Sequence, residues 1–214
     1  AMGAQHRKLG VPAEDELGGR GVSYCATCDA AFFRQKPTII VGGGDSAMEE
    51  AMFLSKFADK VAIVNRRDEF RASKIMLERA RALDNIEWLT PYVVKEFIPS
   101  DGSLAQVLLR NTQDDSERKV EIAGAFIAIG HEPQSQLVQG QVETDAAGYV
   151  VTQGRSTLTS VPGVFAAGDL VDHTYRQAVT AAGTGCQAAL DAEWYLRDTD
   201  SLIDRPAAAV TAAE

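Results

Sequence analysis

The chain has 214 residues, of which 45% are hydrophobic and 24% are charged, a composition typical of a globular protein with a substantial core. Its formal net charge is -9 and it contains no dense run of Lys and Arg, which argues against nucleic acid or an anionic membrane as a partner. No apolar run reaches about eighteen residues, and the first residues lack the apolar stretch of a signal peptide, so we expect no membrane span and a cytoplasmic protein.

The first informative segment contains two of the three cysteines, in the run Cys25-Ala26-Thr27-Cys28-Asp29. A zinc site needs about four ligands and this motif supplies two, with no second paired motif in the chain, so we predict no metal site. A cysteine at a helix N-terminus has a stabilised thiolate, and a two-residue gap lets the pair close into a reducible disulfide. Asp29 is a candidate proton donor or acceptor, with a simple helix cap as the alternative. The segment therefore predicts thiol exchange.

A strand, a tight turn and a helix follow. The β-branched run at residues 38–41 breaks into Gly42-Gly43-Gly44 and then into the helix-forming residues from Asp45 and Ser46 onward, with a second strand at residues 60–65. Glycines after an apolar strand and before a helix form the dinucleotide fingerprint, because they let a pyrophosphate approach the backbone at the helix N-terminus. The pattern predicts a βαβ unit that binds a dinucleotide.

The end of the second strand indicates which dinucleotide is bound. An NAD site usually places an acidic residue there, whereas this chain has Arg66, Arg67 and, slightly later, Arg71. Guanidinium groups suit a ribose 2′-phosphate through charge-assisted hydrogen bonds, so we predict NADP. The alternative is a solvated basic corner neutralised by Asp68 and Glu69.

The remaining elements are expected as follows. Residues 71–83 predict a helix, residues 92–122 an antiparallel meander, and residues 125–129 an apolar strand that ends at Gly130. His131-Glu132-Pro133 is interpreted as a hinge or exit turn at a domain boundary. Beyond it we expect a strand and turn at residues 163–169, a helix from Tyr175 to about Arg197 that buries Cys186, and a disordered tail.

These motifs together resemble those of the low-molecular-weight bacterial thioredoxin reductases. The likeness covers nearly the whole chain and rests on segments that include Ser23 to Asp29, Val41 to Ala51, Arg66 to Ala72, Gly130 to Pro133 and Gly163 to Asp169. It implies an α/β fold: a Rossmann-like NADP-binding domain with an antiparallel meander, joined to the C-terminal half of an FAD-binding domain. The implied division is residues 1–6 (FAD-domain segment and hinge), 7–130 (NADP and redox disulfide), 131–197 (FAD domain) and 198–214 (tail).

The resemblance also implies how the parts work. Hydride passes from NADPH to FAD, electrons pass to Cys25 and Cys28, and the dithiol reduces thioredoxin or a thioredoxin-like protein; the full-length family members are commonly dimers. Two domain orientations alternate about hinges near Gly3 and Gly130. The implied NADP residues are Gly42, Gly43, Gly44, Asp45, Ser46, Arg66, Arg67, Arg71 and Gly130, and the implied FAD residues are Gly3, Gly168, Asp169, Arg176, Gln177 and Ala178.

Some positions depart from the family pattern. The family's first glycine fingerprint, which holds the ADP part of FAD, is expected upstream of Ala1, Asn65 replaces a histidine, and Ala13 and Ala30 replace glycines. Two alternative functions follow. One is a reductase of a peroxiredoxin or another disulfide partner, which would prefer NADH; the other is an inactive nucleotide-binding fragment, because half of the FAD site is missing.

Overall fold

The computed structural model describes residues 1–203, and its backbone separates into two compact units. Unit 1 combines residues 1–5 with the residues from 131 onward, and unit 2 is formed by residues 6–130. The chain therefore crosses between the units twice, at residues 5–6 and 130–131, whereas the sequence interpretation places the first boundary between residues 6 and 7.

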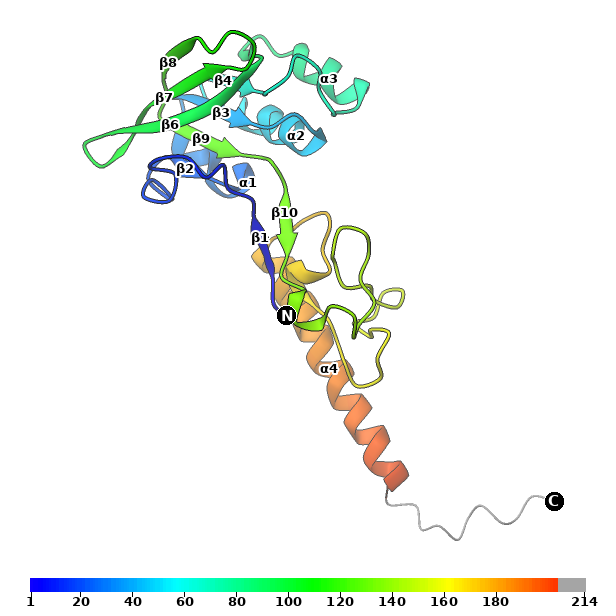
Figure 1. Ribbon diagram of the computed structural model, residues 1–214. Helices are drawn as coiled ribbons and strands as arrows, with labels where there is room; N and C mark the ends of the chain where they lie inside the picture. The colour runs from blue at the N-terminus through cyan, green and yellow to red at the C-terminus, as the bar shows by residue number, and fades with distance from the viewer. Residues whose placement is uncertain (204–214) are drawn as a thin grey trace, which may run out of the picture. The chain divides into compact units, whose positions relative to one another are not determined.

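Unit 2 is built on a five-stranded parallel sheet in the order β2-β9-β3-β4-β5 (Figure 1). Its strands are β2 (Val22–Ser23), β3 (Pro37–Val41), β4 (Lys60–Val64), β5 (Ile86–Leu89) and β9 (Gly124–Ile127). The short helices α1 (Ala26–Asp29) and η1 (Ala30–Phe33) precede β3, while α2 (Asp45–Leu54) and α3 (Lys74–Arg81) follow β3 and β4. An antiparallel sheet of β6 (Tyr92–Ser100), β7 (Ser103–Asn111) and β8 (Glu117–Glu121) completes the unit.

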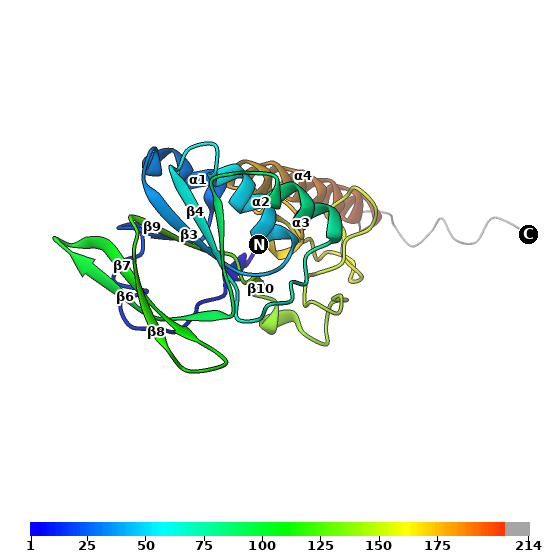
Figure 2. The ribbon, with the colours of Figure 1, turned by 90° about the horizontal axis from the view of Figure 1, so that it is seen from above.

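The parallel sheet is covered on both faces, which explains its continuous apolar strands. Because side chains alternate along a strand, Ile39 and Val41 pack into one core cluster and Ile40 packs into the other. The first cluster includes Phe97 and Val107 of the antiparallel sheet, and the second is formed largely with α2 and α3. Figure 2 shows this order of helices, parallel sheet and antiparallel sheet. Unit 2 is therefore a three-layer α/β structure.

Unit 1 has little regular structure apart from its last helix. It contains β10 (His131–Pro133), which pairs with β1 (Ala4–His6), the short helices η2 (Gln136–Val138) and η3 (Gly168–Leu170), and the long helix α4 (Ala178–Ile203). Its apolar core is a small cluster made chiefly of Val142, Val150, Ala166 and Leu170.

Several elements differ from the sequence predictions. The βαβ unit and the meander are confirmed, but His131–Pro133 forms a strand rather than an exit turn, because β1 pairs with it. Helix α4 continues past Arg197 to Ile203, since no Gly or Pro interrupts that stretch; residues 204–214 of the predicted tail lie outside the described residues. Cys186 is exposed rather than buried, because it lies on a part of α4 that other described residues do not cover.

Candidate active site

The glycine loop lies where β3 ends and α2 begins, and its shape requires small residues. A Cβ atom at Gly42 would lie 2.4 Å from the carbonyl oxygen of Ala128, and one at Gly43 would lie 2.5 Å from the Asn65 side-chain oxygen. Gly44 precedes α2 as its N-cap residue, with open space beside its Cα. The loop therefore presents bare backbone at a helix N-terminus, a geometry that suits a pyrophosphate.

The arginine-bearing segment after β4 is hydrogen-bonded directly to the glycine loop. The carbonyl oxygen of Gly43 accepts from the backbone N–H groups of Arg71 (2.8 Å) and Ala72 (3.0 Å). Asp45, the first residue of α2, accepts from the backbone N–H of Ser73 at 2.6 Å through its carboxylate. These bonds hold Arg71 beside the loop predicted to bind the pyrophosphate.

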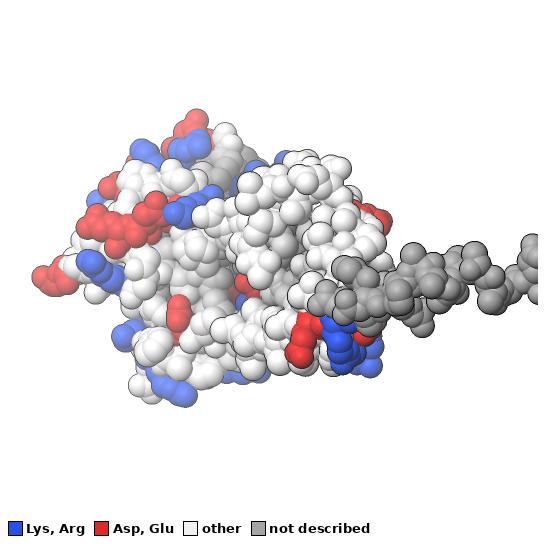
Figure 3. Space-filling view, turned by 90° about the horizontal axis from the view of Figure 1, so that it is seen from below, with Lys and Arg blue, Asp and Glu red and all other residues white. Residues whose placement is uncertain are grey.

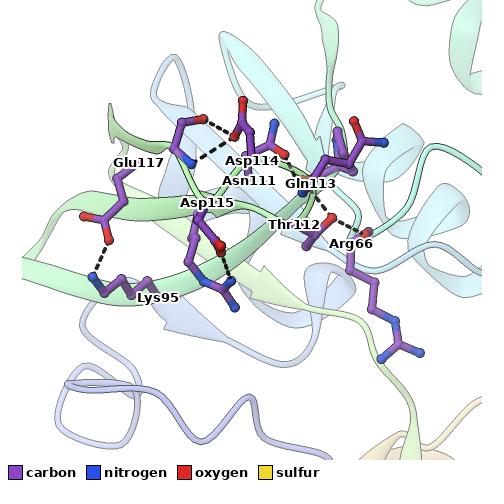
Figure 4. Close-up of polar contacts among 11 residues, drawn as sticks. Arg66, Lys95, Asn111, Thr112, Gln113, Asp114, Asp115 and Glu117 are labelled. Atoms are coloured by element: carbon purple, nitrogen blue, oxygen red, sulfur yellow. Dashed lines mark hydrogen bonds and ion pairs between the residues drawn. The ribbon is translucent and has the colours of Figure 1, made fainter.

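Asn65 stabilises the other end of this segment. Its side-chain amide donates to the carbonyl oxygens of Arg67 (2.6 Å) and Glu69 (3.1 Å). The Thr112 hydroxyl donates to the carbonyl oxygen of Arg66 at 3.1 Å, while the Arg66 guanidinium extends away from this contact (Figure 4). The residue that replaces the family's histidine therefore shapes the backbone that carries Arg66 and Arg67.

The three arginines are exposed, and within residues 1–203 the structure records no ion pair for Arg66, Arg67 or Arg71. Asp68 does not neutralise them: its carboxylate accepts from the Thr90 hydroxyl and the Gln113 amide instead. In this structure Asp68 therefore does not form the ion pair with the arginines that neutralisation by its carboxylate would require.

The two cysteines of the Cys-x-x-Cys motif form a disulfide at the start of α1, with Cα atoms 5.3 Å apart. Cys25 is the N-cap residue, and its sulfur accepts from the backbone N–H of Cys28 at 3.1 Å. The first backbone N–H of α1, that of Ala26, donates to the Glu50 carboxylate of α2 at 3.3 Å. The predicted redox pair thus lies at a helix start that is anchored to the helix after the glycine loop.

Asp29 follows Cys28 directly and is held by a serine that the sequence analysis did not single out. The buried Ser23 hydroxyl donates to the Asp29 carboxylate at 2.6 Å and accepts from the Cys25 backbone N–H at 3.2 Å. The Asp29 side chain makes no capping hydrogen bond to the following 3-10 helix η1, so the cap alternative is not what the structure shows. Ser23 lies in a segment that carries the family resemblance, two residues before Cys25, but no pattern in the sequence indicates its contact with Asp29.

All these groups follow the carboxyl ends of neighbouring parallel strands. The cysteines follow β2, Gly130 follows β9, the glycine loop follows β3 and the arginines follow β4. Carboxyl ends of parallel strands share one edge of a sheet, where ligands of open α/β sheets bind. Unit 2 therefore brings the redox disulfide and the predicted dinucleotide residues to the same edge.

The sequence interpretation also missed a buried acid, Glu14, in the segment between the first crossing and Cys25. Glu14, which is 2% exposed, accepts from the backbone N–H groups of Leu9 (2.9 Å) and Gly10 (2.7 Å) and from the Tyr24 hydroxyl (3.0 Å). Burial, together with the Glu14 charge, raises the pKa of Tyr24, whose ring stacks on His6. No sequence motif marks this arrangement.

The residues predicted to bind FAD lie in unit 1. Gly168 and Asp169 open η3, and Asp169 has a buried Oδ1 without a hydrogen-bond partner. Burial and the charge of Asp172 raise the pKa of Asp169, with Arg176 opposing them. An unpaired buried acceptor next to a glycine with φ of 77° fits a ligand hydroxyl, such as one on the sugar chain of a flavin.

Three of the other predicted FAD residues, Arg176, Gln177 and Ala178, follow this turn closely in the sequence. Three successive backbone N–H groups, those of Thr174, Tyr175 and Arg176, donate to the Asp172 carboxylate, which fixes the segment before α4. Gln177 donates to the Tyr175 carbonyl, and Ala178 is the first residue of α4. Gly3, whose carbonyl accepts from the Gln134 N–H at 2.9 Å, lies at the other end of the unit's sequence.

Within residues 1–203, no helix has the length and apolar character of a membrane span, and no three or more His, Cys, Asp or Glu side chains are grouped as metal ligands would be. On the face drawn in Figure 3, basic and acidic side chains are interspersed and no broad basic area gathers.

Comparisons with known proteins agree with one another. The family model of the pyridine nucleotide-disulphide oxidoreductases matches residues 1–185. A thioredoxin reductase from Mycolicibacterium smegmatis is 60% identical over 200 residues, which are 94% of this chain and 64% of that protein. A bifunctional thioredoxin reductase/thioredoxin from Mycobacterium leprae is 56% identical, over 92% of this chain and 43% of that protein.

Solved structures give the same result. The chain superimposes on a thioredoxin reductase from Streptococcus pyogenes with a TM-score of 0.87 and 42% identity, over 92% of this chain and 64% of that one. For a thioredoxin reductase from Giardia duodenalis the TM-score is 0.84, with 43% identity, over 91% of this chain and 64% of that one. The chain thus spans less than two thirds of the length of these relatives.

Proposed function

The chain belongs to the pyridine nucleotide-disulphide oxidoreductase family, and from that premise we propose that the whole protein is an NADPH-dependent flavoprotein that reduces thioredoxin through Cys25 and Cys28. The observation that carries the proposal is the shared sheet edge: the Cys25–Cys28 disulfide follows β2, and the three exposed arginines follow β4 of the same parallel sheet. The names of the relatives support thioredoxin as the acceptor.

Each group has a defined part in the proposal. The backbone at Gly42 to Gly44 would hold the pyrophosphate of NADPH, and Arg66, Arg67 and Arg71 its 2′-phosphate. The unpaired Oδ1 of Asp169 would bind FAD. When bound, NADPH and FAD supply the hydride-transfer chemistry that delivers two electrons to the protein disulfide.

The protein's own residues then carry out thiol–disulfide exchange. The two electrons and one proton convert the Cys25–Cys28 disulfide into one thiolate and one thiol. The thiolate attacks the disulfide of thioredoxin, which gives a mixed disulfide and a free thioredoxin thiolate. The second cysteine gives up its proton and attacks the mixed disulfide, so the Cys25–Cys28 bond forms again. With one further proton from the solvent, thioredoxin leaves with two thiols. Asp29, positioned by Ser23, would supply the proton that the leaving thiolate needs.

The decisive test uses the full-length protein with its flavin bound and the Cys28→Ser variant. The variant cannot form the disulfide, so we expect thioredoxin reduction to fall at least about a thousandfold, since the covalent route is lost. Bleaching of the flavin absorbance by NADPH should persist, because hydride transfer does not use Cys28.

Cys186→Ser is the matched control, since this exposed cysteine is outside the disulfide and should leave turnover unchanged. Thioredoxin reduction by the Cys28→Ser variant at the normal rate would contradict the proposal. A wild-type protein that prefers NADH would favour the peroxiredoxin-reductase alternative.

The proposal also covers assembly and location. We expect a cytoplasmic homodimer, as the resemblance to the thioredoxin reductases implies. Light scattering of the full-length protein would measure its mass. Stoichiometric FAD in the absorbance spectrum of the 214-residue chain would contradict the alternative of an inactive fragment.

A further inference from the structure

We propose that Thr90 and Gln113 determine the preference for NADP(H) over NAD(H) by holding the Asp68 carboxylate away from the three arginines. We refer to these two residues and Asp68 as the Asp68 clamp. The inference rests on the proposed NADPH site and adds residues that lie outside the fingerprint and outside the arginine positions. It concerns unit 2 alone.

The clamp engages both oxygens of one carboxylate. The Thr90 hydroxyl donates to Oδ1 of Asp68 at 3.0 Å, and the Gln113 side-chain amide donates to Oδ2 at 3.1 Å. Thr90 follows β5, whereas Gln113 lies in the turn after β7, so two separate segments converge on Asp68. Both donors are neutral and therefore satisfy the carboxylate without adding a positive charge.

The turn that carries Gln113 is itself well ordered by hydrogen bonds. The backbone N–H of Gln113 donates to the Asn111 side-chain oxygen at 2.8 Å. Its neighbour Thr112 donates from its backbone N–H to the Pro91 carbonyl at 2.9 Å and from its hydroxyl to the Arg66 carbonyl (Figure 4). One turn thus contacts both the backbone of Arg66 and the side chain of Asp68.

Electrostatics gives the clamp its effect on specificity. Asp68 is exposed and directly follows Arg67, so a released carboxylate could pair with a nearby guanidinium. It would then compete with the 2′-phosphate of NADP, and it could also accept from the 2′-hydroxyl of NAD, as acidic residues do in NAD sites. Held by neutral donors, Asp68 leaves the guanidinium groups of Arg66 and Arg67 available for the phosphate.

The experiment measures the affinities of the 214-residue chain for NADP+ and NAD+ by titration calorimetry. In a Thr90→Val, Gln113→Leu double variant the preference for NADP+ should fall about fivefold, the effect expected of one exposed charge pair. Gln113→Leu alone should lower the preference by part of this amount. Because the Gln113 side chain is exposed, this single variant should remain folded. Gln106→Leu, on β7 but outside the clamp, is the matched control and should leave the preference unchanged.

A further substitution shows whether the lost preference for NADP+ has an electrostatic or a structural cause. Adding Asp68→Asn to the double variant removes the competing charge and should restore the preference to within about twofold of wild type. A merely structural loss would not be restored. The proposal is overturned if the double variant keeps the wild-type preference, or if Asp68→Asn does not restore it.

The same titration shows whether the proposed NADPH site is wrong or only the Asp68 clamp. A wild-type chain that binds NAD+ as tightly as NADP+ would overturn the proposed NADPH site and the clamp together. A wild-type preference for NADP+ that the double variant retains would overturn the clamp alone.

Discussion

Two acidic side chains, one in each unit, show how differently the two units satisfy their buried polar atoms. Glu14 in unit 2 is 2% exposed and accepts from backbone N–H groups of the loop at residues 9–11 and from Tyr24. Asp169 in unit 1 has a buried oxygen with no partner. A buried acceptor without a partner is costly, so the first acid stabilises its surroundings and the second is suited to a ligand.

The same contrast extends to apolar surfaces. The sheet of unit 2 is covered on both faces, and Phe97, Phe126 and Ile40 are fully buried. Unit 1 has a small core, and α4 exposes Val179, Trp194 and Leu196. Unit 2 is therefore internally complete, whereas unit 1 has surfaces suited to further partners, among them the proposed flavin.

The largest expected effect comes from Glu14→Ala. It leaves the N–H groups of Leu9 and Gly10 without their acceptor, so we expect unit 2 to lose about 3 to 5 kcal/mol of stability. The chain has two tryptophans, Trp88 in unit 2 and Trp194 in unit 1, so urea unfolding of a Trp194→Phe background, followed by fluorescence, reports on unit 2 alone.

Glu14→Gln is the control for this prediction. The glutamine side chain keeps one acceptor oxygen, so this variant should lose clearly less stability than Glu14→Ala. A loss below about 1 kcal/mol for Glu14→Ala would remove the contrast with Asp169, because the loop would then not depend on its carboxylate.

For Asp169→Asn in the flavin-free chain we expect a smaller effect of opposite sign, an increase in stability. Because burial raises the pKa of Asp169, its contribution to stability is present below the ordinary value of 3.8 and is lost as the pH rises through the folded pKa. At pH 7 the asparagine variant should therefore be more stable, by about 1 kcal/mol, and the difference should vanish in acid. Thermal unfolding at pH 7 and near pH 3.5, read from Trp194 fluorescence in a Trp88→Phe background, measures it.

Asp172→Asn should behave in the opposite way. Burial acts to raise the pKa of Asp172, but hydrogen bonds from the N–H groups of Tyr175, Thr174 and Arg176 outweigh it and lower the pKa. This carboxylate stabilises the fold above its ordinary pKa, and that contribution is lost as the pH falls. Equal effects of the two substitutions would show that Asp169 is not exceptional.

The smallest effect is expected at Ala13, next to Glu14, which has a φ of 64°. This left-handed conformation is unfavourable for a residue with a Cβ, so Ala13→Gly should stabilise unit 2 by up to about 1 kcal/mol. Ala30, the other alanine at a family glycine, is right-handed helical with a φ of -52° and serves as the control, because glycine should not help there. Urea unfolding followed at Trp88 detects both.

Local signals were sufficient to predict much of unit 2. The run at Thr38 to Val41, followed by three glycines, predicted a strand, a loop and a helix, and β3, the glycine loop and α2 have that form. The meander followed from short strands separated by turn residues such as Asp101 and Gly102. These features depend on neighbours in sequence, which is why the sequence reveals them.

What the sequence did not reveal depends on distant partners. The strand β2 has only two residues, too few for any periodicity, and is a strand because it pairs with β9. The partners of Asp68 lie 22 and 45 residues away, and no local pattern connects them. Cys186 was expected to be buried because its neighbours are small and apolar, but whether a helix face is covered depends on what packs against it.

The double crossover has a consequence for modularity. The backbone N–H of Arg7 donates to the carbonyl oxygen of Gly130 at 3.0 Å, so the two ends of residues 7–130 meet. A segment whose ends meet can be inserted into a host chain, or exchanged for another, without stretching the flanking strands. Residues 7–130, which carry the disulfide and the glycine loop, thus form an insertion with its own core. A single proteolytic cut at either crossing would still leave this segment covalently attached to the rest of the chain through the other crossing.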